Sequence, residues 1–474
     1  MAQQTRTLRA AGLNEKRCII REDLNLYNNI VTMCTFTSSE PPSRQEIIKA
    51  ISACISEHPV LSVVIQDADT EQPKLRRVDT MDIDHHLDFL EADATLSGQE
   101  RIFSKLHNEP EAVTRLQPQW RLVVASAKTG SDPRTKFHVA FACSHNLMDG
   151  MSGYAFHKTF LRSLKNPKLE LVQASSIYEV PHELKPLPPM DSHLSISWSF
   201  LLGPVIKEYF PSSISKLLGL NSEIPVSAWL GASKRPPLSS DSTFPPTSVH
   251  LTSVPASILK KTLSACKNHS TRLTALLNHL FARALSRALS KRSQNHTTFL
   301  AQTAIDLRRA IGQGENEMGN YVSAITETIK ISPHTVGLSE AEWHSARLLT
   351  EKLAAASSTT KDHTVGLLKY LSNFREWTIR NSKLPADVSF EISNLGVFEG
   401  DEGGCRIEDM IFSQSANGTG PPFSVNVASA KDAALMLSVT WWPGMLGVDD
   451  EEEFVEEVCE DVRREMECMT KEDV

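Results

Sequence analysis

The first half of the chain alternates between segments whose apolar residues recur at helical spacing and short apolar runs typical of strands. In residues 44–57, RQEIIKAISACISE, apolar positions recur at helical spacing, and Ser43 followed by Glu46 is the pattern of a helix-capping box. The same reasoning predicts helices at 99–107 and 152–165, and strands at 58–65, 119–128 and 136–143. A chain that alternates in this way is expected to form an α/β fold.

The second half repeats this alternation in a loosely similar order. Residues 271–291 are rich in Ala and Leu, with apolar positions recurring every three and four residues, and they give the strongest helix signal in the chain. A further helical stretch is expected at about 340–380. Strands are expected at 249–254, 388–392 and 434–442, and residues 299–309 are expected to begin as a strand and end as a loop.

The two halves are separated by a stretch, 181–247, that contains segments rich in proline and serine. Proline fixes φ and removes a backbone donor, so segments such as PHELKPLPPM resist regular structure. With 474 residues the chain is too long for one ordinary core and suits two domains of roughly 200 residues each. We therefore predict a domain at 1–180, a crossover linker at 181–247 that packs on the surface, and a second domain at 248–474.

Composition and charge exclude several classes of protein. Hydrophobic residues make up 41% and charged residues 22%, and the formal net charge of −8 gives no general attraction to nucleic acid or anionic lipid. No apolar window approaches the roughly 18 residues of a transmembrane helix, and the N-terminus lacks the apolar run of a signal peptide, so a cytoplasmic protein without a membrane span is expected. The acidic run at 449–473 is interpreted as the solvated face of a helix.

Motifs for several kinds of chemistry are absent. Eight cysteines are scattered without a CxxC pair, mostly in apolar runs where a free cysteine behaves as a small hydrophobe. Neither a disulfide framework nor a zinc site is therefore predicted. The sequence also contains no P-loop, no Rossmann glycine pattern and no Gly-x-Ser-x-Gly elbow, so nucleotide binding and serine-nucleophile chemistry have no motif support.

The segment 141–156, FACSHNLMDGMSGYAF, carries the candidate chemistry. An apolar strand ends, the residues HNLMDG follow at 145–150, and a helix begins. In the functional interpretation His145 is a base, because an imidazole whose proton affinity lies near neutral pH can accept and return a proton. Asp149 then orients the loop, and Gly150 allows a sharp backbone turn.

Residue types alone leave other interpretations of this segment open. His145 can be a satisfied histidine in an ordinary turn, because His-x-x-x-Asp-Gly is a short pattern. His145 and Asp149 can offer two metal ligands, although local spacing indicates no third. Cys143 would share the strand face of His145, which leaves a thiolate role open.

The HNLMDG segment resembles the HxxxDG motif of the chloramphenicol-acetyltransferase-like (CAT-like) superfamily, which includes plant-type acyltransferases and peptide-synthetase condensation domains. The wider pattern is most similar to fungal alcohol acetyltransferases. Its segments span nearly the whole chain in the expected order: GLNEKRC at 12–18, LNLYNNI at 24–30, HPVLSVVI at 58–65, WRLVV at 120–124, LTALLNHLFARAL at 273–285, Asp306-Leu307-Arg308, Met318-Gly319-Asn320-Tyr321 and SNLGVF at 393–398. The sequence departs from the superfamily pattern in two places. Ser144 replaces the first histidine of condensation domains, which leaves the base role intact because only the second histidine is essential to it. The plant-type DFGWG motif is absent, which argues against a plant-type enzyme and for the fungal group.

The resemblance implies two similar CAT-like α/β domains, with mixed β-sheets flanked by helices and an active-site channel at their interface. It implies an acyl-CoA-dependent O-acyltransferase with His145 as general base, which transfers an acyl group, expected to be acetyl, to the hydroxyl of a small alcohol or secondary metabolite within a ternary complex. Asp149 is expected to pair with Arg308, and Ser393 and Asn394 are candidates for oxyanion or substrate binding. Acetyl-CoA or another acyl-CoA is the expected co-substrate, with no metal and no permanently bound cofactor.

Three rival functions remain open at this point. An N-acyltransferase would use the same scaffold on an amine, and a condensation-type enzyme would take its acyl group from a carrier protein. A non-catalytic relative would only bind a carrier domain or ligand, and the presence of His145 argues against it. We expect a monomer that binds acyl-CoA and a small-molecule alcohol but no nucleic acid.

Overall fold

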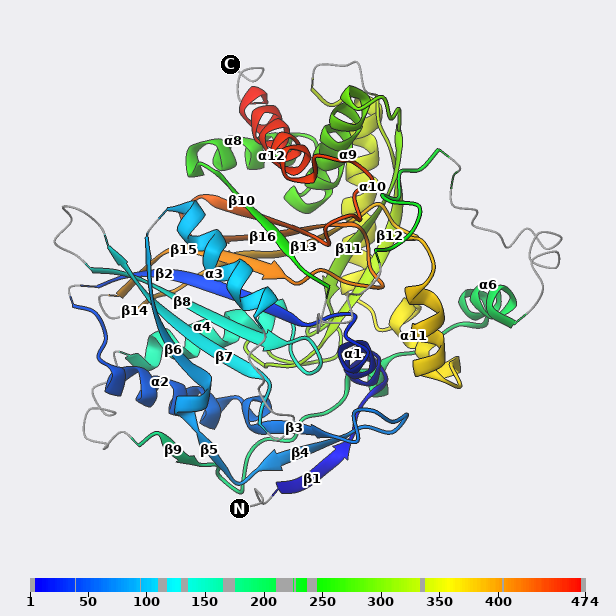
Figure 1. Ribbon diagram of the computed structural model, residues 1–474. Coiled ribbons are helices and arrows are strands. Elements are labelled where there is room, and N and C mark those ends of the chain that lie inside the picture. The colour runs from blue at the N-terminus through cyan, green and yellow to red at the C-terminus, as the bar shows by residue number, and fades with distance from the viewer. Residues whose placement is uncertain are drawn as a thin grey trace.

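The computed structural model describes residues 5–38, 40–93, 95–109, 117–128, 135–164, 175–209, 225, 227–236, 245–332, 337–402 and 405–469. Within these residues two six-stranded sheets dominate (Figure 1). The first sheet contains, in spatial order, β14 (Asp401–Glu402), β15 (Cys405–Gln414), β2 (Asn29–Ser38), β8 (Thr135–Ser144), β7 (Trp120–Lys128) and β6 (Leu87–Asp93). The second contains β10 (Ser248–Val254), β17 (Leu435–Trp441), β16 (Phe423–Ala430), β13 (Phe390–Phe398), β11 (Thr298–Asp306) and β12 (Val322–Lys330).

The remaining elements are two small sheets and the helices. The small sheets pair β1 (Thr5–Ala10), β4 (Lys74–Val78) and β3 (Val63–Gln66), and separately β5 (Thr80–Asp82) and β9 (Ile177–Glu179). The α-helices of the described residues are α1 (Leu13–Asp23), α2 (Arg44–Glu57), α3 (Leu96–Asn108), α4 (Gly150–Leu164), α6 (Trp198–Tyr209), α8 (Ala256–Asn268), α9 (Leu273–Lys291), α10 (Glu340–Ser357), α11 (Phe374–Ser382) and α12 (Glu451–Cys468). Short 3-10 helices occur at η1 (Pro59–Ser62), η2 (Ile83–His86), η3 (Met190–His193) and η4 (Thr364–Tyr370). None of these helices is long and apolar enough to cross a membrane.

Both large sheets are mixed, which confirms the predicted α/β fold class. In the first sheet β6 and β7 run parallel and the other strands pair antiparallel. In the second, β13 lies parallel to both β11 and β16. Parallel neighbours need a crossover, and in the second sheet helix α10 lies between β12 and β13 along the chain.

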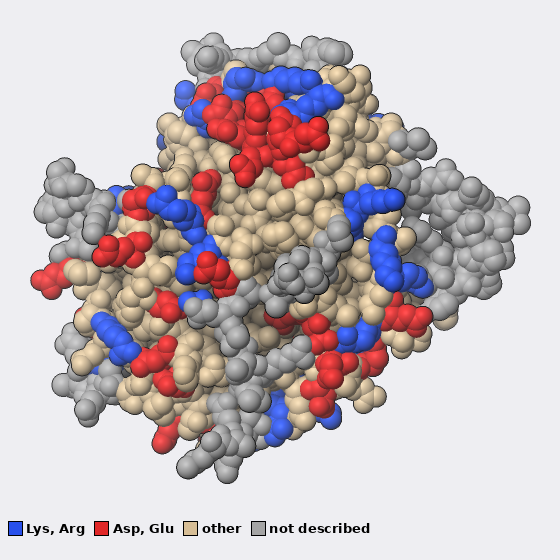
Figure 2. Space-filling model, viewed as in Figure 1, with Lys and Arg blue, Asp and Glu red and all other residues tan. Residues whose placement is uncertain are grey.

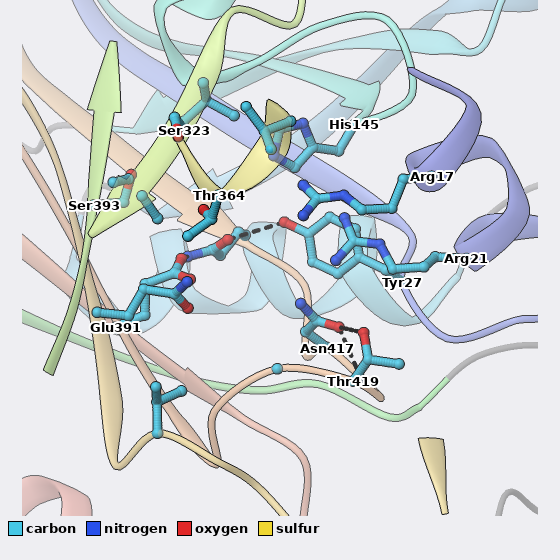
Figure 3. Close-up of a pocket in the computed structure, with 18 of the residues that line it drawn as sticks. Arg17, Arg21, Tyr27, His145, Ser323, Thr364, Glu391, Ser393, Asn417 and Thr419 are labelled. Atoms are coloured by element: carbon cyan, nitrogen blue, oxygen red, sulfur yellow. Dashed lines mark hydrogen bonds between the residues drawn. The ribbon is translucent and has the colours of Figure 1, made fainter. Parts of the chain in front are cut away.

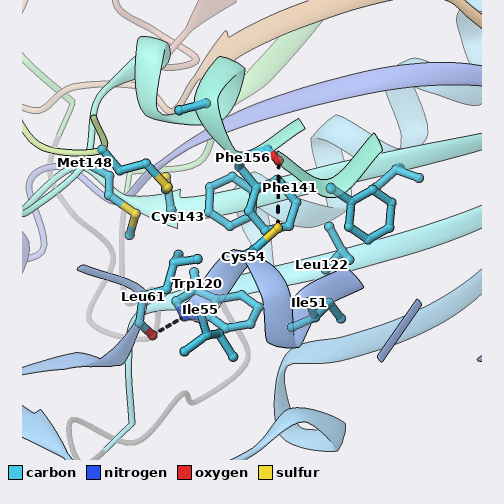
Figure 4. Packing of buried hydrophobic residues seen from close by; sticks show 14 of the residues in the cluster. Ile51, Cys54, Ile55, Leu61, Trp120, Leu122, Phe141, Cys143, Met148 and Phe156 are labelled. Atoms are coloured by element: carbon cyan, nitrogen blue, oxygen red, sulfur yellow. Dashed lines mark hydrogen bonds between the residues drawn. The ribbon is translucent and has the colours of Figure 1, made fainter. Parts of the chain in front are cut away.

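Helices α2 and α4 cover one face of the first sheet and close the core of the first half (Figure 1). The helix at Arg44–Glu57 begins with the predicted capping box, in which Ser43 accepts from the Glu46 amide. Figure 4 shows the packing beneath these helices, where Phe141 of β8 stacks on Phe156 of α4 with 4.0 Å between ring centroids. This packing fixes the end of β8 relative to the start of α4, and the motif loop lies between them.

Helices α9, α10 and α12 cover the outer side of the second sheet (Figure 1). Helix α9 is buried along most of its length, which fits its Ala- and Leu-rich sequence. The two sheets also contact each other. Val31 and Met33 of β2 and Ile411 of β15 share a core with Leu251 of β10 and Met436 of β17.

The two sheets do not divide the chain at a single point. Strands β14 and β15, from the second half of the sequence, extend the first sheet, and β15 pairs antiparallel with β2. Every residue of β2 is buried, so this strand needs a hydrogen-bonding neighbour on both edges. The domain boundaries at 1–180 and 248–474 stay a prediction, and strands β14 and β15 of the predicted second domain belong to the first sheet.

Several predicted elements differ in the structure. The strand expected at 58–65 is wrong in its first part, because Pro59 lacks an N–H and starts η1 before β3 begins. The crossover 181–247 contains helix α6, formed by the apolar stretch between its proline-rich segments. The helical stretch at 340–380 is broken into α10, η4 and α11, and the strand expected at 388–392 continues to Phe398.

Candidate active site

The motif loop joins the end of β8 to the start of α4. Strand β8 ends at Ser144, and α4 begins at Gly150. Gly150 does not have a positive φ, but a Cβ at this position would lie 2.5 Å from Leu395 Cδ2. The structure thus gives Gly150 a different role from the sharp turn expected of it: it leaves room for β13, which carries Leu395, to approach α4 closely.

The His145 ring is held with one nitrogen committed to the backbone. Its Nδ1–H donates to the carbonyl oxygen of Met148 at 2.7 Å. Because Nδ1 carries the proton, the neutral ring keeps its lone pair on Nε2. Asn320 Nδ2 donates to the His145 carbonyl oxygen at 2.7 Å, and Asn14 Nδ2 donates to Asn320 Oδ1 at 3.0 Å. The second half of the chain therefore helps to fix the backbone of this histidine.

The surroundings of His145 keep its imidazole neutral at ordinary pH. Burial is the largest cause and lowers its pKa to about 4, and the positive charge of Arg21 acts in the same direction. The Met148 carbonyl and Asp149 act the other way without reversing the shift. A neutral imidazole with a free Nε2 lone pair can accept a proton from a hydroxyl or amine placed against it.

Asp149 and Arg308 form a buried, bidentate ion pair between the two halves of the chain. Arg308 Nη1 and Nη2 donate to the two carboxylate oxygens of Asp149 at 2.9 and 2.7 Å. The backbone N–H groups of Ser152 and Tyr321 also donate to this carboxylate, at 2.9 and 3.0 Å. Burial alone would raise the pKa of Asp149, but the charge and hydrogen bonds of Arg308 bring it below its usual value. Asp149 is thus an ionised anchor of the loop.

A cavity of about 360 Å³ opens beside His145 and is lined by both halves of the chain (Figure 3). Tyr27 of the first half contributes to its wall, with its ring centroid 5.5 Å from that of His145. Gln302, Ser323 and Glu391 of the second sheet line it from the other side. A cavity of this size suits a small-molecule ligand.

Of the two candidates on β13, the structure brings only Ser393 to the cavity wall. Asn394 is occupied elsewhere: its Nδ2 donates to Thr274 Oγ1 at 2.9 Å, and its Oδ1 accepts from the Gly396 amide at 2.9 Å. Successive side chains of a strand point to opposite faces, so Ser393 and Asn394 cannot both face the cavity. Asn394 instead shapes the irregular end of β13.

The geometry does not support a thiolate role for Cys143 or a metal site at His145 and Asp149. Cys143 is buried in the core beneath α4, and burial raises the pKa of its thiol well above the usual value. His145 follows the last residue of β8, so the two do not share a strand face. In the part of the chain that the structure describes, no group of three or more His, Cys, Asp or Glu residues could hold a metal ion.

The cavity wall also contains charged residues that sequence reasoning missed. Arg17 and Arg21 come from α1, and Glu391 comes from β13. The spacing of the two arginines, four residues apart, would have placed them on one face of a helix had α1 been predicted. No local pattern marks Glu391, because only the sheet order brings β13 opposite α1.

Comparison with known proteins agrees with this fold. Residues 87–460 match the family model described as alcohol acetyltransferase. The probable alcohol acetyltransferase FCK4 of Fusarium pseudograminearum is 21% identical over 93% of this chain and 92% of its own length. An uncharacterised protein of Schizosaccharomyces pombe is 24% identical over 91% of both chains.

Solved structures share the same architecture. The trichothecene 15-O-acetyltransferase TRI3 of Fusarium sporotrichioides superposes with a TM-score of 0.66 at 13% identity, over 98% of this chain and 95% of its own. The epimerization domain of tyrocidine synthetase B superposes with a TM-score of 0.58 at 13% identity, over 100% of both chains. The fold is therefore that of CAT-like acyltransferases and condensation-type domains. Since the family model covers most of the sequence, the chain is an acyltransferase that belongs to the alcohol acetyltransferase family.

Proposed function

We propose that this acyltransferase moves an acyl group, most simply acetyl, from acyl-CoA to the hydroxyl of a small molecule, with His145 as general base. The observation that carries the proposal is the hydrogen bond from His145 Nδ1–H to the Met148 carbonyl. It leaves the Nε2 lone pair for the cavity, where an acceptor hydroxyl would donate to it.

The proposed reaction needs no acyl-enzyme. The acceptor oxygen attacks the thioester carbonyl as its proton passes to His145 Nε2, and a new C–O bond forms in a tetrahedral oxyanion. The C–S bond then breaks, and His145 returns the proton to the departing CoA sulfur. Such a base contributes roughly 10²–10⁴-fold to the rate.

Other parts of the proposal concern the surroundings of His145. Ser393 lines the cavity, so its hydroxyl is the candidate donor to the oxyanion. The cavity would belong to a channel between the domains at 1–180 and 248–474, with 181–247 as the crossover, so that CoA and the acceptor enter from different sides. A monomeric state and a cytoplasmic location remain predictions from the sequence.

The proposal is tested by incubating the purified protein with acetyl-CoA and a panel of alcohols and amines. Thiol release and the acetylated product, by mass spectrometry, are followed for the wild type, His145→Ala and His145→Gln. We expect ester formation by the wild type, and a kcat at least about 10²-fold lower in both variants with little change in melting temperature.

Two control variants sharpen this test. Cys143→Ala removes the nearby thiol, and His85→Ala removes an exposed histidine outside the cavity; both should keep the wild-type kcat. Near-normal turnover by a folded His145→Ala protein would refute the base assignment. Amide products alone would favour N-acylation, and activity only with a carrier-bound acyl donor would favour a condensation-type enzyme.

A further inference from the structure

Helix α1 presents two arginines to the cavity beside His145. Arg17 and Arg21 are four residues apart, on one face of the helix, and both line the cavity wall. Figure 3 shows both side chains reaching from α1 toward the space that lies opposite Glu391. The guanidinium carbon of Arg21 lies 5.0 Å from the centroid of the Tyr27 ring, and that centroid lies 5.5 Å from the centroid of the His145 ring.

Neither arginine has a counter-charge in contact with it. Among the described residues no carboxylate forms an ion pair with Arg17 or Arg21, and the Nε atoms of both are buried without a hydrogen-bond partner. Arg235, also in the cavity wall, differs, because it donates to the carbonyl oxygens of Leu384 and Gly420 at 2.9 and 3.1 Å. Burial and the charge of Arg21 lower the pKa of Arg17, as expected for two like charges withdrawn from water.

Glu391 does not neutralise this pair by contact. Its carboxylate accepts from Gln414 Nε2 at 2.7 Å on the far wall, and Tyr27 Oη donates to Gln414 Oε1 at 2.9 Å. Burial raises the pKa of Glu391, which favours its neutral form. Two guanidinium groups thus face the carboxyl group of Glu391 across the cavity, while Asp387, also in the wall, acts electrostatically on Arg235.

We propose that Arg17 and Arg21 form an anion-binding subsite that holds the carboxylate of a hydroxy-acid acceptor while its hydroxyl reaches His145. This inference rests on the proposed function and names the class of its acceptor. Guanidinium groups bind carboxylates and phosphates with paired, charge-assisted hydrogen bonds. Arg21 contacts the Tyr27 ring, and the Tyr27 ring contacts His145. Because only this ring separates Arg21 from His145, one small molecule can contact both residues.

The same subsite chemistry would fit a phosphate of CoA. The pantetheine arm, however, separates the phosphates of CoA from its reacting thioester by a long chain. An anion bound next to the base is therefore better explained by the acceptor. A bound carboxylate would also compensate the positive charge that acts on His145, which would increase its proton affinity when the acceptor is present.

The test compares hydroxy acids with their methyl esters, which keep the hydroxyl and the shape but lose the charge. Mandelate and 3-(4-hydroxyphenyl)propionate, each with its methyl ester, are acetylated from acetyl-CoA by the wild type, Arg17→Gln, Arg21→Gln, Arg17→Lys and Lys16→Gln. The wild type should favour the acid over the ester by at least about tenfold in kcat/KM, since a charged hydrogen-bonded pair discriminates by this order.

The glutamine variants should lower the acid-to-ester ratio of kcat/KM by about 10–100-fold. The ratio is the readout because both arginines also act on the pKa of His145, and that effect is common to acid and ester. Arg17→Lys should recover part of the loss, because it keeps the charge. Lys16→Gln removes a positive charge from the same helix outside the cavity, where Lys16 pairs with Glu71, and should leave both substrates unchanged. Equal acid and ester rates in the wild type, with no effect of the arginine variants, would overturn the inference.

Replacing acetyl-CoA by S-acetyl-N-acetylcysteamine, which has no phosphate, separates the two sources of the anion. If Arg17 and Arg21 hold an acceptor carboxylate, their substitution still lowers acid turnover with this donor. If the effect disappears, and KM for acetyl-CoA rises with every acceptor, the pair binds CoA and the acceptor assignment is wrong. Transfer to neutral alcohols without an acid preference would reject this inference alone, whereas no transfer to any alcohol would reject the proposed function itself.

Discussion

At the scale of single residues, the Asp149–Arg308 pair joins the two halves of the chain. The two residues are 159 positions apart, and their side chains are 6% and 1% exposed. Two charges so deeply buried are tolerated only when each is fully hydrogen-bonded. Arg308 meets this condition by donating also to Asp306 and to the carbonyl oxygens of Glu317 and Gly319.

We predict that Asp149→Asn costs up to about 3–5 kcal/mol of stability and also lowers activity, because it leaves the buried Arg308 with only the partly exposed carboxylate of Asp306 as a counter-charge. A double-mutant cycle with Arg308→Met, measured by chemical unfolding, should give a coupling energy well above about 0.5 kcal/mol. His145→Ala serves as the comparison that spares stability. A coupling energy near zero would contradict the prediction, and a stable but inactive Asp149→Asn would point to a direct catalytic role for the carboxylate.

At the scale of elements, helix α12 shows how an acidic sequence becomes part of the fold. Its apolar face packs into the core of the second half. Its first turn is acidic, and negative charge at the N-terminus of a helix interacts favourably with the helix dipole. Figure 2 shows its acidic side chains gathered on the surface beside basic ones. Arg283 of α9 lies buried between Glu342 and Glu465, while the exposed Lys291 pairs with Glu457. The interpretation of 449–473 as a solvated helix face is therefore incomplete, since α9 pairs with these carboxylates.

We predict that Arg283→Met and Lys291→Met differ sharply, although each removes one cation from α9. Arg283→Met leaves the buried Glu342 carboxylate without a counter-charge and should cost about 3–5 kcal/mol of unfolding free energy. Lys291 is 67% exposed, so its loss should cost no more than about 1 kcal/mol. Thermal and chemical unfolding of the two variants tests this, and equal effects would refute it. Neither residue lines the cavity, so both proteins should keep their activity at low temperature.

At the scale of the whole molecule, the buried histidines couple folding to pH. Burial lowers the pKa of four of them to about 3 or 4: His58, His107, His145 and His157. In the unfolded chain these groups take up protons near 6.5, so between about pH 6.5 and 4 the unfolded state binds more protons than the folded state. The pKa values of His86, His138 and His279 are lowered as well. The raised pKa values of three carboxyl groups, Asp306, Glu391 and Asp409, act in the opposite sense but are fewer than the lowered pKa values of the histidines.

We therefore predict that the melting temperature is highest near neutral pH and falls as the pH is lowered from 7 to 5. Differential scanning calorimetry at constant ionic strength measures this directly. His157→Gln should make the dependence less steep, because that position can no longer be protonated in the unfolded state. A melting temperature that stays constant or increases as the pH is lowered from 7 to 5 would contradict the assignment of these histidines as buried and neutral.

The sequence by itself determined the features that depend on neighbouring residues. The capping box at Ser43 and the periodic positions of α2 and α9 were sufficient to predict both helices, because helix formation follows local spacing. The place of His145 after an apolar strand and before a helix follows from the same kind of local pattern. The ordered set of motifs likewise predicted the family.

Tertiary structure alone decided which distant segments meet. Strands β2 and β16 were not predicted, although the sequence of β16, FSVNVASA, alternates apolar and polar residues. Both strands are buried along their whole length, and only the sheet order shows which strands lie on either side of them. Helix α1 and strand β13 face each other across the cavity because of the sheet order, so the opposition of Arg17 and Arg21 to Glu391 has no counterpart in local sequence. The same holds for the small side chain required at Gly150 and for the turning of Asn394 away from the cavity. Local periodicity records which face of an element is buried, whereas the packing of sheets and helices fixes what that face meets.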